Sequence, residues 1–246
     1  MNIAYSFILS FIAGISTLIG FLFIFIKSSK EKVISASLGI SCGVMITVSI
    51  IDLIPNSFLL LINKNILYTL FLILIGFLIG IFISSIIDQK VDKNSKNSIK
   101  LYKLGIISMF VLIMHNIPEG IVTFITSTSN IKLGISLTIA IALHNIPEGI
   151  SISIPIYYST KSKLKAFLYT FISGISEPIG AILAYIILAK YINNMVLGIL
   201  YSIIAGMMIN IAINNLYKES INYNKKNTNI YFLIGIIIML ISHIII

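Results

Sequence analysis

Residues 101–160 read LYKLGIISMFVLIMHNIPEGIVTFITSTSNIKLGISLTIAIALHNIPEGISISIPIYYST and contain one hexapeptide twice. His-Asn-Ile-Pro-Glu-Gly occupies positions 115–120 and again 144–149. Chance repetition of six residues that include His, Pro and Glu is negligible in a chain of 246 residues. Each copy lies near the middle of an apolar run that is long enough to cross a bilayer. The two copies are therefore expected on consecutive, antiparallel membrane helices.

The composition of the whole chain is that of a membrane protein. Hydrophobic residues make up 58% of it and charged residues only 10%, whereas a soluble domain is about half apolar and a quarter charged. The net charge of +9 comes from lysines in short loops rather than from a basic patch, so no nucleic-acid partner is expected. The single cysteine, Cys42, excludes an internal disulfide and a thiolate cluster.

The apolar runs predict an all-α, polytopic fold with eight transmembrane helices. The first run begins at Ile3 with no basic residue before it, so we expect a membrane span there rather than a signal peptide. The length fits one membrane domain over 1–246. The predicted spans are about 3–26, 33–56, 66–87, 101–126, 133–157, 166–189, 196–217 and a short last one, 230–246.

Lysine distribution predicts the orientation. Of the 17 lysines, all but Lys64, Lys132 and Lys190 fall in or at the edge of the loops after spans one, three, five and seven. Cytoplasmic loops carry the excess of Lys and Arg, so both termini are expected outside the cytoplasm. The loop between spans three and four, about 88–100, is rich in Lys and Asn, contains no histidine, and is expected to be cytoplasmic.

Four carboxylates fall inside the predicted spans: Asp52, Glu119, Glu148 and Glu177. A charged carboxylate in hydrocarbon costs at least about 2.5 kcal/mol and is usually paired or functional. Apart from Lys103, at the loop end of the fourth span, no Lys or Arg lies within these spans to pair with them. The compensating partner must therefore be a proton or a bound cation.

Histidine spacing favours a bound metal. His115 precedes Glu119 by four residues, and His144 precedes Glu148 by four, so each pair shares one helix face. The amide oxygens of Asn116 and Asn145 can join them. Imidazole, carboxylate and amide ligands without thiolate suit Zn²⁺ and Fe²⁺ best, with Mn²⁺ and Co²⁺ also acceptable, whereas Ca²⁺ and Mg²⁺ prefer oxygen alone.

The remaining motif residues predict the local backbone. Pro118 and Pro147 lack the N–H that a helix interior requires, so we expect a kink beside each His–Glu pair and carbonyl oxygens turned toward a polar site. Gly120 and Gly149 should allow close helix approach.

Four further sets of polar residues fall within the predicted spans. Glu177, in Ser-Gly-Ile-Ser-Glu-Pro-Ile-Gly-Ala at 173–181, is expected to complete a second metal position with the two asparagines. Asp52, in Ile-Asp-Leu-Ile-Pro-Asn, either admits or relays the metal or caps a polar helix end. His243 is expected to have no role. Interhelical hydrogen bonds, a water-lined face and a metal role are alternatives for the asparagines of span seven, Asn210, Asn214 and Asn215.

The duplicated hexapeptide, the Ser-Glu-Pro-Ile-Gly-Ala of span six and the eight spans resemble the ZIP (Zrt/Irt-like) family of metal importers, and within it the bacterial broad-specificity zinc-uptake branch. The resemblance covers essentially the whole chain. It implies a 3+2+3 arrangement of helices with both termini outside, and a multi-pass position in a bacterial plasma membrane. It further implies that the divalent metal is a substrate and no resident cofactor is needed, and that the protein can form a homodimer.

The resemblance also implies the ligand sets of a binuclear site. His115, Glu119, His144 and Glu148 would form one position. Asn116, Glu119, Asn145, Glu148 and Glu177 would form the other. Spans one, four, five and six would move as an elevator against spans two, three, seven and eight. The chain departs from many members in lacking a histidine-rich 3–4 loop, which leaves metal capture by that loop in doubt.

Two other functions share these residues. An intramembrane metal-dependent hydrolase would hold Zn²⁺ with three protein ligands and a water, but the sequence lacks a His-Glu-x-x-His helix. A passive metal-selective channel would use the same ligands as an importer. We expect a divalent transition-metal importer with Zn²⁺ as its foremost substrate, and no enzyme activity.

Overall fold

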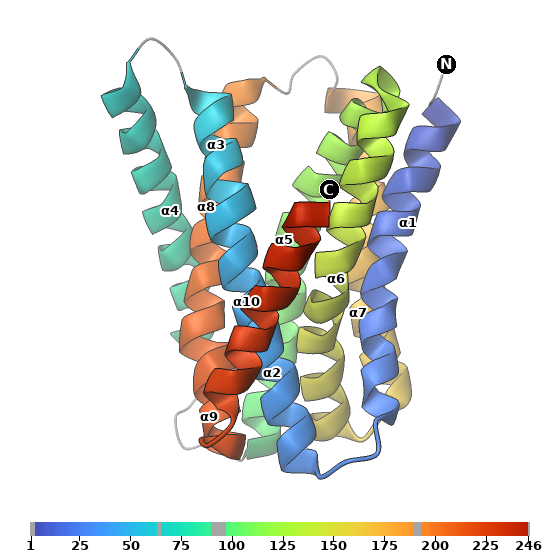
Figure 1. The fold of residues 1–246 in the computed structure, drawn as a ribbon, viewed down its shortest axis with the longest axis vertical. Coiled ribbons are helices and arrows are strands. Elements are labelled where there is room, and N and C mark those ends of the chain that lie inside the picture. Colours follow the sequence, from blue (N-terminus) through green and yellow to red (C-terminus); the bar gives the residue numbers. More distant parts are fainter. Residues whose placement is uncertain (1–2, 63–64, 90–96, 189–192, 246) are drawn as a thin grey trace.

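The computed structural model describes residues 3–62, 65–89, 97–188 and 193–245, and these form eight helical rods (Figure 1). Seven are long and apolar enough to cross a membrane, and the eighth, at the C-terminus, is a shorter apolar helix. The prediction of an all-α, multi-pass membrane protein is confirmed. The rods are α1–η1 (Ile3–Phe21, Leu22–Phe25), α2–η2–α3 (Lys30–Val48, Ser49–Leu53, Ile54–Leu61), α4 (Ile66–Gln89), α5 (Asn97–Ser129), α6 (Ile131–Thr160), α7–η3 (Lys163–Leu183, Ala184–Leu188), α8–η4–α9 (Asn194–Ile211, Ala212–Tyr217, Lys218–Asn224) and α10 (Thr228–Ile245).

Most helices are longer than the spans predicted for them. Helix α5 covers 97–129 where 101–126 was predicted, and the α2–η2–α3 rod covers 30–61 where 33–56 was predicted. Hydropathy locates only the segment within hydrocarbon, whereas backbone hydrogen bonding continues the helix into polar flanks. The predicted 88–100 loop lies largely outside the described residues, as do Lys64 and Lys190.

The motif helices do not end at their prolines. Helix α5 continues through Pro118, and α6 continues through Pro147 and Pro155. The second rod, α2–η2–α3, contains a π-helical turn, η2, that ends two residues before Pro55. Proline has no N–H for the usual helical bond, and π turns recur at functional sites. Asp52 lies in this turn.

The rods associate in two groups. Helices α5 and α6 pack together, and α1 and α7 pack on them. In the second group α10 packs along α2, and α8 packs along α3 and α4. Helix α2 contacts α6 and α8 contacts α5 where the groups meet. Because the rods alternate in direction, the start of α1 and the end of α10 lie toward the same end of the bundle (Figure 1).

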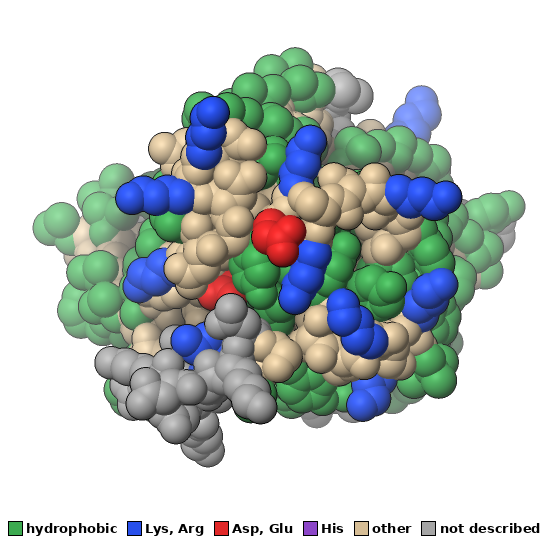
Figure 2. Space-filling view, turned by 90° about the horizontal axis from the view of Figure 1, so that it is seen from below, with side chains coloured by type: hydrophobic (Ala, Val, Ile, Leu, Met, Phe, Trp, Pro, Cys, Tyr) green, Lys and Arg blue, Asp and Glu red, His purple; other side chains and the backbone are tan. Residues whose placement is uncertain are grey.

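The opposite end of the molecule carries the lysines. Figure 2 shows this end with lysine side chains spread around its rim and few carboxylates among them. It is formed by the turns between α1 and α2, between α6 and α7, and between α9 and α10. The asymmetry predicted from the loops is thus present in the folded molecule.

Motif glycines bring the first group into backbone contact. A Cβ added at Gly120 would lie 1.8 Å from the carbonyl oxygen of Glu177 in α7, and one at Gly149 would lie 2.0 Å from the carbonyl oxygen of Thr17 in α1. Real Cβ atoms do not approach backbone this closely, so only glycine fits. Small residues of this kind let membrane helices pack tightly.

Gly149→Val should destabilise this contact. Because the clash is with backbone, α1 and α6 must separate, and overpacking of this kind costs about 1–3 kcal/mol or more. We expect a lower thermal midpoint in detergent and loss of zinc uptake. Ile139→Val, on the exposed face of the same helix, is the control. Equal midpoints for the two variants would show that the close approach is unimportant.

Candidate metal centre

The two hexapeptides meet where α5 and α6 pack together. The carboxylate oxygen Oε1 of Glu119 lies 3.2 Å from Nε2 of His115 on its own helix and 3.1 Å from Nε2 of His144 on α6. Glu148 Oε1 lies 3.7 Å from His115 Nε2. The two imidazole rings have centroids 6.1 Å apart. The i, i+4 spacing thus places two imidazoles and two carboxylates in one cluster, which we call the motif cluster (His115, Glu119, His144, Glu148).

The motif cluster is buried and short of hydrogen bonds. His115 and Glu148 are fully buried, and His144 and Glu119 nearly so. Within the described residues, several buried atoms have no hydrogen-bond partner: both Glu148 carboxylate oxygens, Glu119 Oε2, His144 Nδ1 and both His115 ring nitrogens. Buried polar atoms are normally satisfied, so each exception requires an explanation. A cation would supply the missing partner for several of them at once.

The distances fit a common metal ion. One ligand atom from each of His115, Glu119 and His144 falls within 4.8 Å of the others. Ligands about 2.1 Å from a tetrahedral Zn²⁺ lie roughly 3.4 Å apart, close to the 3.1 and 3.2 Å contacts of Glu119. Because Glu119 Oε1 lies close to Nε2 of both imidazoles, Glu119 is the group that joins the two motifs.

A second set of oxygens lies beside the motif cluster, between α1, α6 and α7. Asn145 Nδ2 donates to Glu177 Oε2 at 3.0 Å and to the Ala13 carbonyl at 2.9 Å. Asn116 Nδ2 donates to the Ser173 carbonyl at 3.1 Å. The side-chain N–H groups of both asparagines are therefore already hydrogen-bonded to acceptors of the protein. The amide oxygens of both asparagines and Glu177 Oε1 are buried without a hydrogen bond, which leaves them available as ligands.

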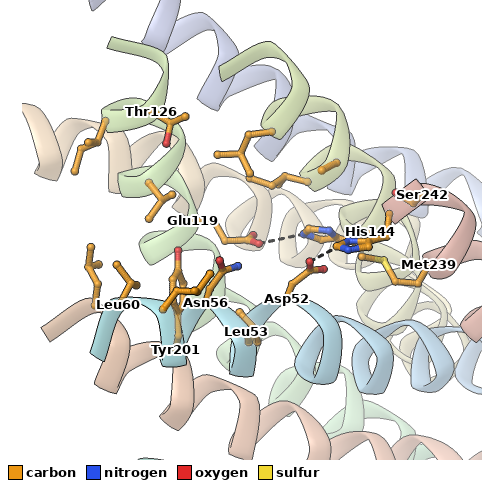
Figure 3. Close-up of a pocket in the computed structure, with 18 of the residues that line it drawn as sticks. Asp52, Leu53, Asn56, Leu60, Glu119, Thr126, His144, Tyr201, Met239 and Ser242 are labelled. Carbon is orange, nitrogen blue, oxygen red and sulfur yellow. Dashed lines mark hydrogen bonds and ion pairs between the residues drawn. The ribbon is translucent and has the colours of Figure 1, made fainter. Parts of the chain in front are cut away.

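A cavity of about 670 Å³ leads from the end of the molecule without the lysine rim to Glu119 and His144. Its outer wall includes Leu59, Leu60 and Asn194, at the adjacent ends of α3 and α8. Figure 3 shows Glu119 facing His144 across the inner part of this space, with Asp52 nearby on the second rod. The structure thus places Asp52 on the route to the motif cluster, although it is not one of its members.

His243 was expected to have no role, but it lines the same cavity. Its Nδ1 lies 3.3 Å from Asp52 Oδ1. Both residues are predicted at the outer ends of their spans, and this shared depth is the sequence signal that could have paired them. The span-seven asparagines are elsewhere: Asn210 donates to Ser84 Oγ at 2.8 Å, and Asn214 donates to Asn210. Interhelical hydrogen bonding, one of the predicted alternatives, accounts for Asn210.

Apolar side chains fill the space between the motif cluster and the lysine-bearing end. They come from both helix groups and include Leu38, Leu104, Ile107, Ile154, Met208 and Leu216, each at most 4% exposed. Within the described residues, the cavity therefore reaches the motif cluster from the side away from the lysines. A buried apolar layer of this kind excludes hydrated ions.

Comparison with known proteins agrees with the geometry. The sequence model of the family described as ZIP Zinc transporter matches residues 84–243. The chain is 38% identical to Zinc transporter ZupT of Streptococcus mutans over 254 residues, covering 96% of each chain. It is 38% identical to Zinc transporter ZupT of Clostridium perfringens over 98% of this chain and 95% of that one. The same-named protein of Campylobacter jejuni is 35% identical, over 96% of this chain and 94% of its own. With matches of this extent, the chain belongs to the ZIP zinc transporter family.

Proposed function

We propose that this protein imports Zn²⁺ into the cytoplasm across a bacterial plasma membrane, and that Fe²⁺, Mn²⁺ and Co²⁺ are further substrates of the same site. The motif cluster carries the proposal, because its two imidazoles and two carboxylates are buried together with unsatisfied ligand atoms. Borderline divalent metals accept this mixture of nitrogen and oxygen. The relatives named zinc transporters support zinc as the first substrate.

The same proposal includes a second metal position. Glu177 and the amide oxygens of Asn116 and Asn145 lie among buried atoms without hydrogen bonds, next to the motif cluster. With Glu119 and Glu148 bridging, they would hold a second ion. Two carboxylates shared between two cations reduce the repulsion that adjacent buried charges would otherwise suffer.

A carrier mechanism is favoured over an open channel. The motif cluster is accessible through the cavity on one side and sealed by apolar side chains on the other. Transport then requires the seal to open on the lysine-bearing side, which the positive-inside rule assigns to the cytoplasm. We infer that α1, α5, α6 and α7 move as one body against the other rods, since these four helices pack closely through glycine contacts.

An enzymatic function is excluded by family membership, because the ZIP zinc transporter family is a family of transporters. The hydrolase alternative would also need a water held on the metal for chemistry on a substrate. The two nearly identical motifs instead supply ligands symmetrically from both helices. This symmetry suits binding and release of an ion.

Transport by purified protein tests the proposal. We expect proteoliposomes with a zinc-sensitive dye inside to show saturable uptake that protein-free liposomes lack. The initial rate should reach a plateau with increasing Zn²⁺, because each cycle delivers only the bound ions. Stoichiometric binding without any uptake would refute the transport function. A rate that rises linearly without a plateau would refute the carrier mechanism and favour a channel.

A further inference from the structure

Asp52 and His243 form a pair that the motif cluster does not use. His243 Nδ1 and Asp52 Oδ1 are 3.3 Å apart, and the side chains are 55% and 28% exposed, respectively. Both line the 670 Å³ cavity that ends at Glu119 and His144. The pair therefore lies in the same cavity that gives access to the buried ligands.

The geometry points to a further metal site of the N,O type, separate from the two metal positions proposed above, which we propose captures the metal before it passes to the motif cluster. Ligand atoms of one Zn²⁺ lie roughly 3.4 Å apart when each bond is about 2.1 Å, which matches the separation of Asp52 and His243. Asn56, one helical turn after Asp52, lines the same cavity and can contribute an amide oxygen. Water from the cavity would complete the shell.

The local backbone supports a functional role for Asp52. It lies in the π turn Ser49–Leu53, just before Pro55. A π turn rotates the following side chains relative to a regular helix and is frequent at functional sites. In Figure 3 the Asp52 carboxylate points from the second rod into the cavity, toward the side where Met239 of α10 lies.

Asp52 and His243 belong to the second helix group, whereas the motif cluster belongs to the first. Asp52 and His243 lie in the second rod and α10, which pack through α2, whereas Glu119 and His144 lie in α5 and α6. A metal bound by Asp52 and His243 would thus pass from the second helix group to the first. Two protein ligands and water bind more weakly than a full ligand set, which suits capture followed by transfer. The inference rests on the proposed import function for its role, but the site itself can be tested by binding alone.

Binding is measured on the full chain in detergent by calorimetry with Zn²⁺. In a Glu119→Ala/Glu148→Ala background, we expect a residual weak site that disappears when His243→Gln is added. Glutamine keeps a hydrogen-bond donor for Asp52, so a purely structural contact should survive. A background that binds no Zn²⁺, or one whose residual binding is unaffected by His243→Gln, overturns the capture site.

Uptake kinetics test whether the Asp52–His243 site captures metal during transport, with the motif cluster left unaltered. His243→Gln should raise the KM for Zn²⁺ roughly tenfold and leave kcat nearly unchanged, because capture precedes the moving step. Thr126→Val, an isosteric change in the same cavity, should leave both constants unchanged. A fall in kcat or in the thermal midpoint with KM constant would contradict capture and indicate a structural pair. If wild type binds at the pair but moves no metal, the import proposal fails and the site stands.

Discussion

Glu119→Ala should abolish zinc uptake by proteoliposomes. Glu119 Oε1 contacts both imidazoles of the motif cluster, so its removal separates the two motifs and leaves the site without its shared oxygen. Losing even an outer partner of a metal ligand costs about 10–100-fold in affinity or activity. We therefore expect a loss of more than about 100-fold in the initial rate, measured with internal zinc-sensitive dye.

The matched control is Glu219→Ala. Glu219 is a carboxylate at the lysine-bearing end whose side chain accepts from Asn222 at 2.9 Å, far in sequence from either motif. This variant should transport at nearly the wild-type rate. Retention of more than half the wild-type uptake by Glu119→Ala would show that the motif cluster does not carry the transported ion.

The architecture could be predicted from the sequence because the length of apolar runs and the distribution of lysines both depend on the bilayer. The length of an apolar run measures hydrocarbon thickness, and so eight rods were found. The exact ends were missed, as at Asn97 and Ser129 of α5, because polar flanking residues continue a helix without any hydropathy signal. The continuation of the helix through Pro118 agrees with the predicted span 101–126, which includes this proline.

The motif cluster could be anticipated because its ligands are local in sequence. His115 with Glu119 is a one-turn pair, and duplication pointed to its counterpart on the next span. The pairing of Asp52 with His243 has no such spacing and only a shared depth in the membrane to indicate it, since these residues are far apart in the chain and meet only when α10 packs along the second rod. Packing between distant helices has no periodic signature.

Acidification should suppress uptake strongly. Metal binds deprotonated imidazole and carboxylate, so protons compete for the same atoms. Reference pKa values are about 6.5 for His and about 4.3 for Glu, and the site is therefore progressively protonated as pH falls from neutral. We expect uptake at pH 5 to be at least about tenfold lower than at pH 7.5, and to fall further toward pH 4.

The measurement uses proteoliposomes whose interior is buffered at neutral pH while the external pH is varied. Zinc entry through an added ionophore in the same vesicles separates loss of the carrier from loss of dye response. Restoring neutral pH should restore uptake, because competition by protons is reversible. A rate that does not change down to about pH 4 would be incompatible with ligation by the motif histidines.

X-ray absorption at the zinc edge of the purified, zinc-loaded protein tests most directly whether the two motifs share a metal. The arrangement of His115, Glu119, His144 and Glu148 predicts a shell of nitrogen and oxygen at about 2.0–2.1 Å, with imidazole scattering that weakens when either histidine is replaced by alanine. A spectrum without imidazole, or one unchanged in both histidine variants, would contradict a metal held between α5 and α6.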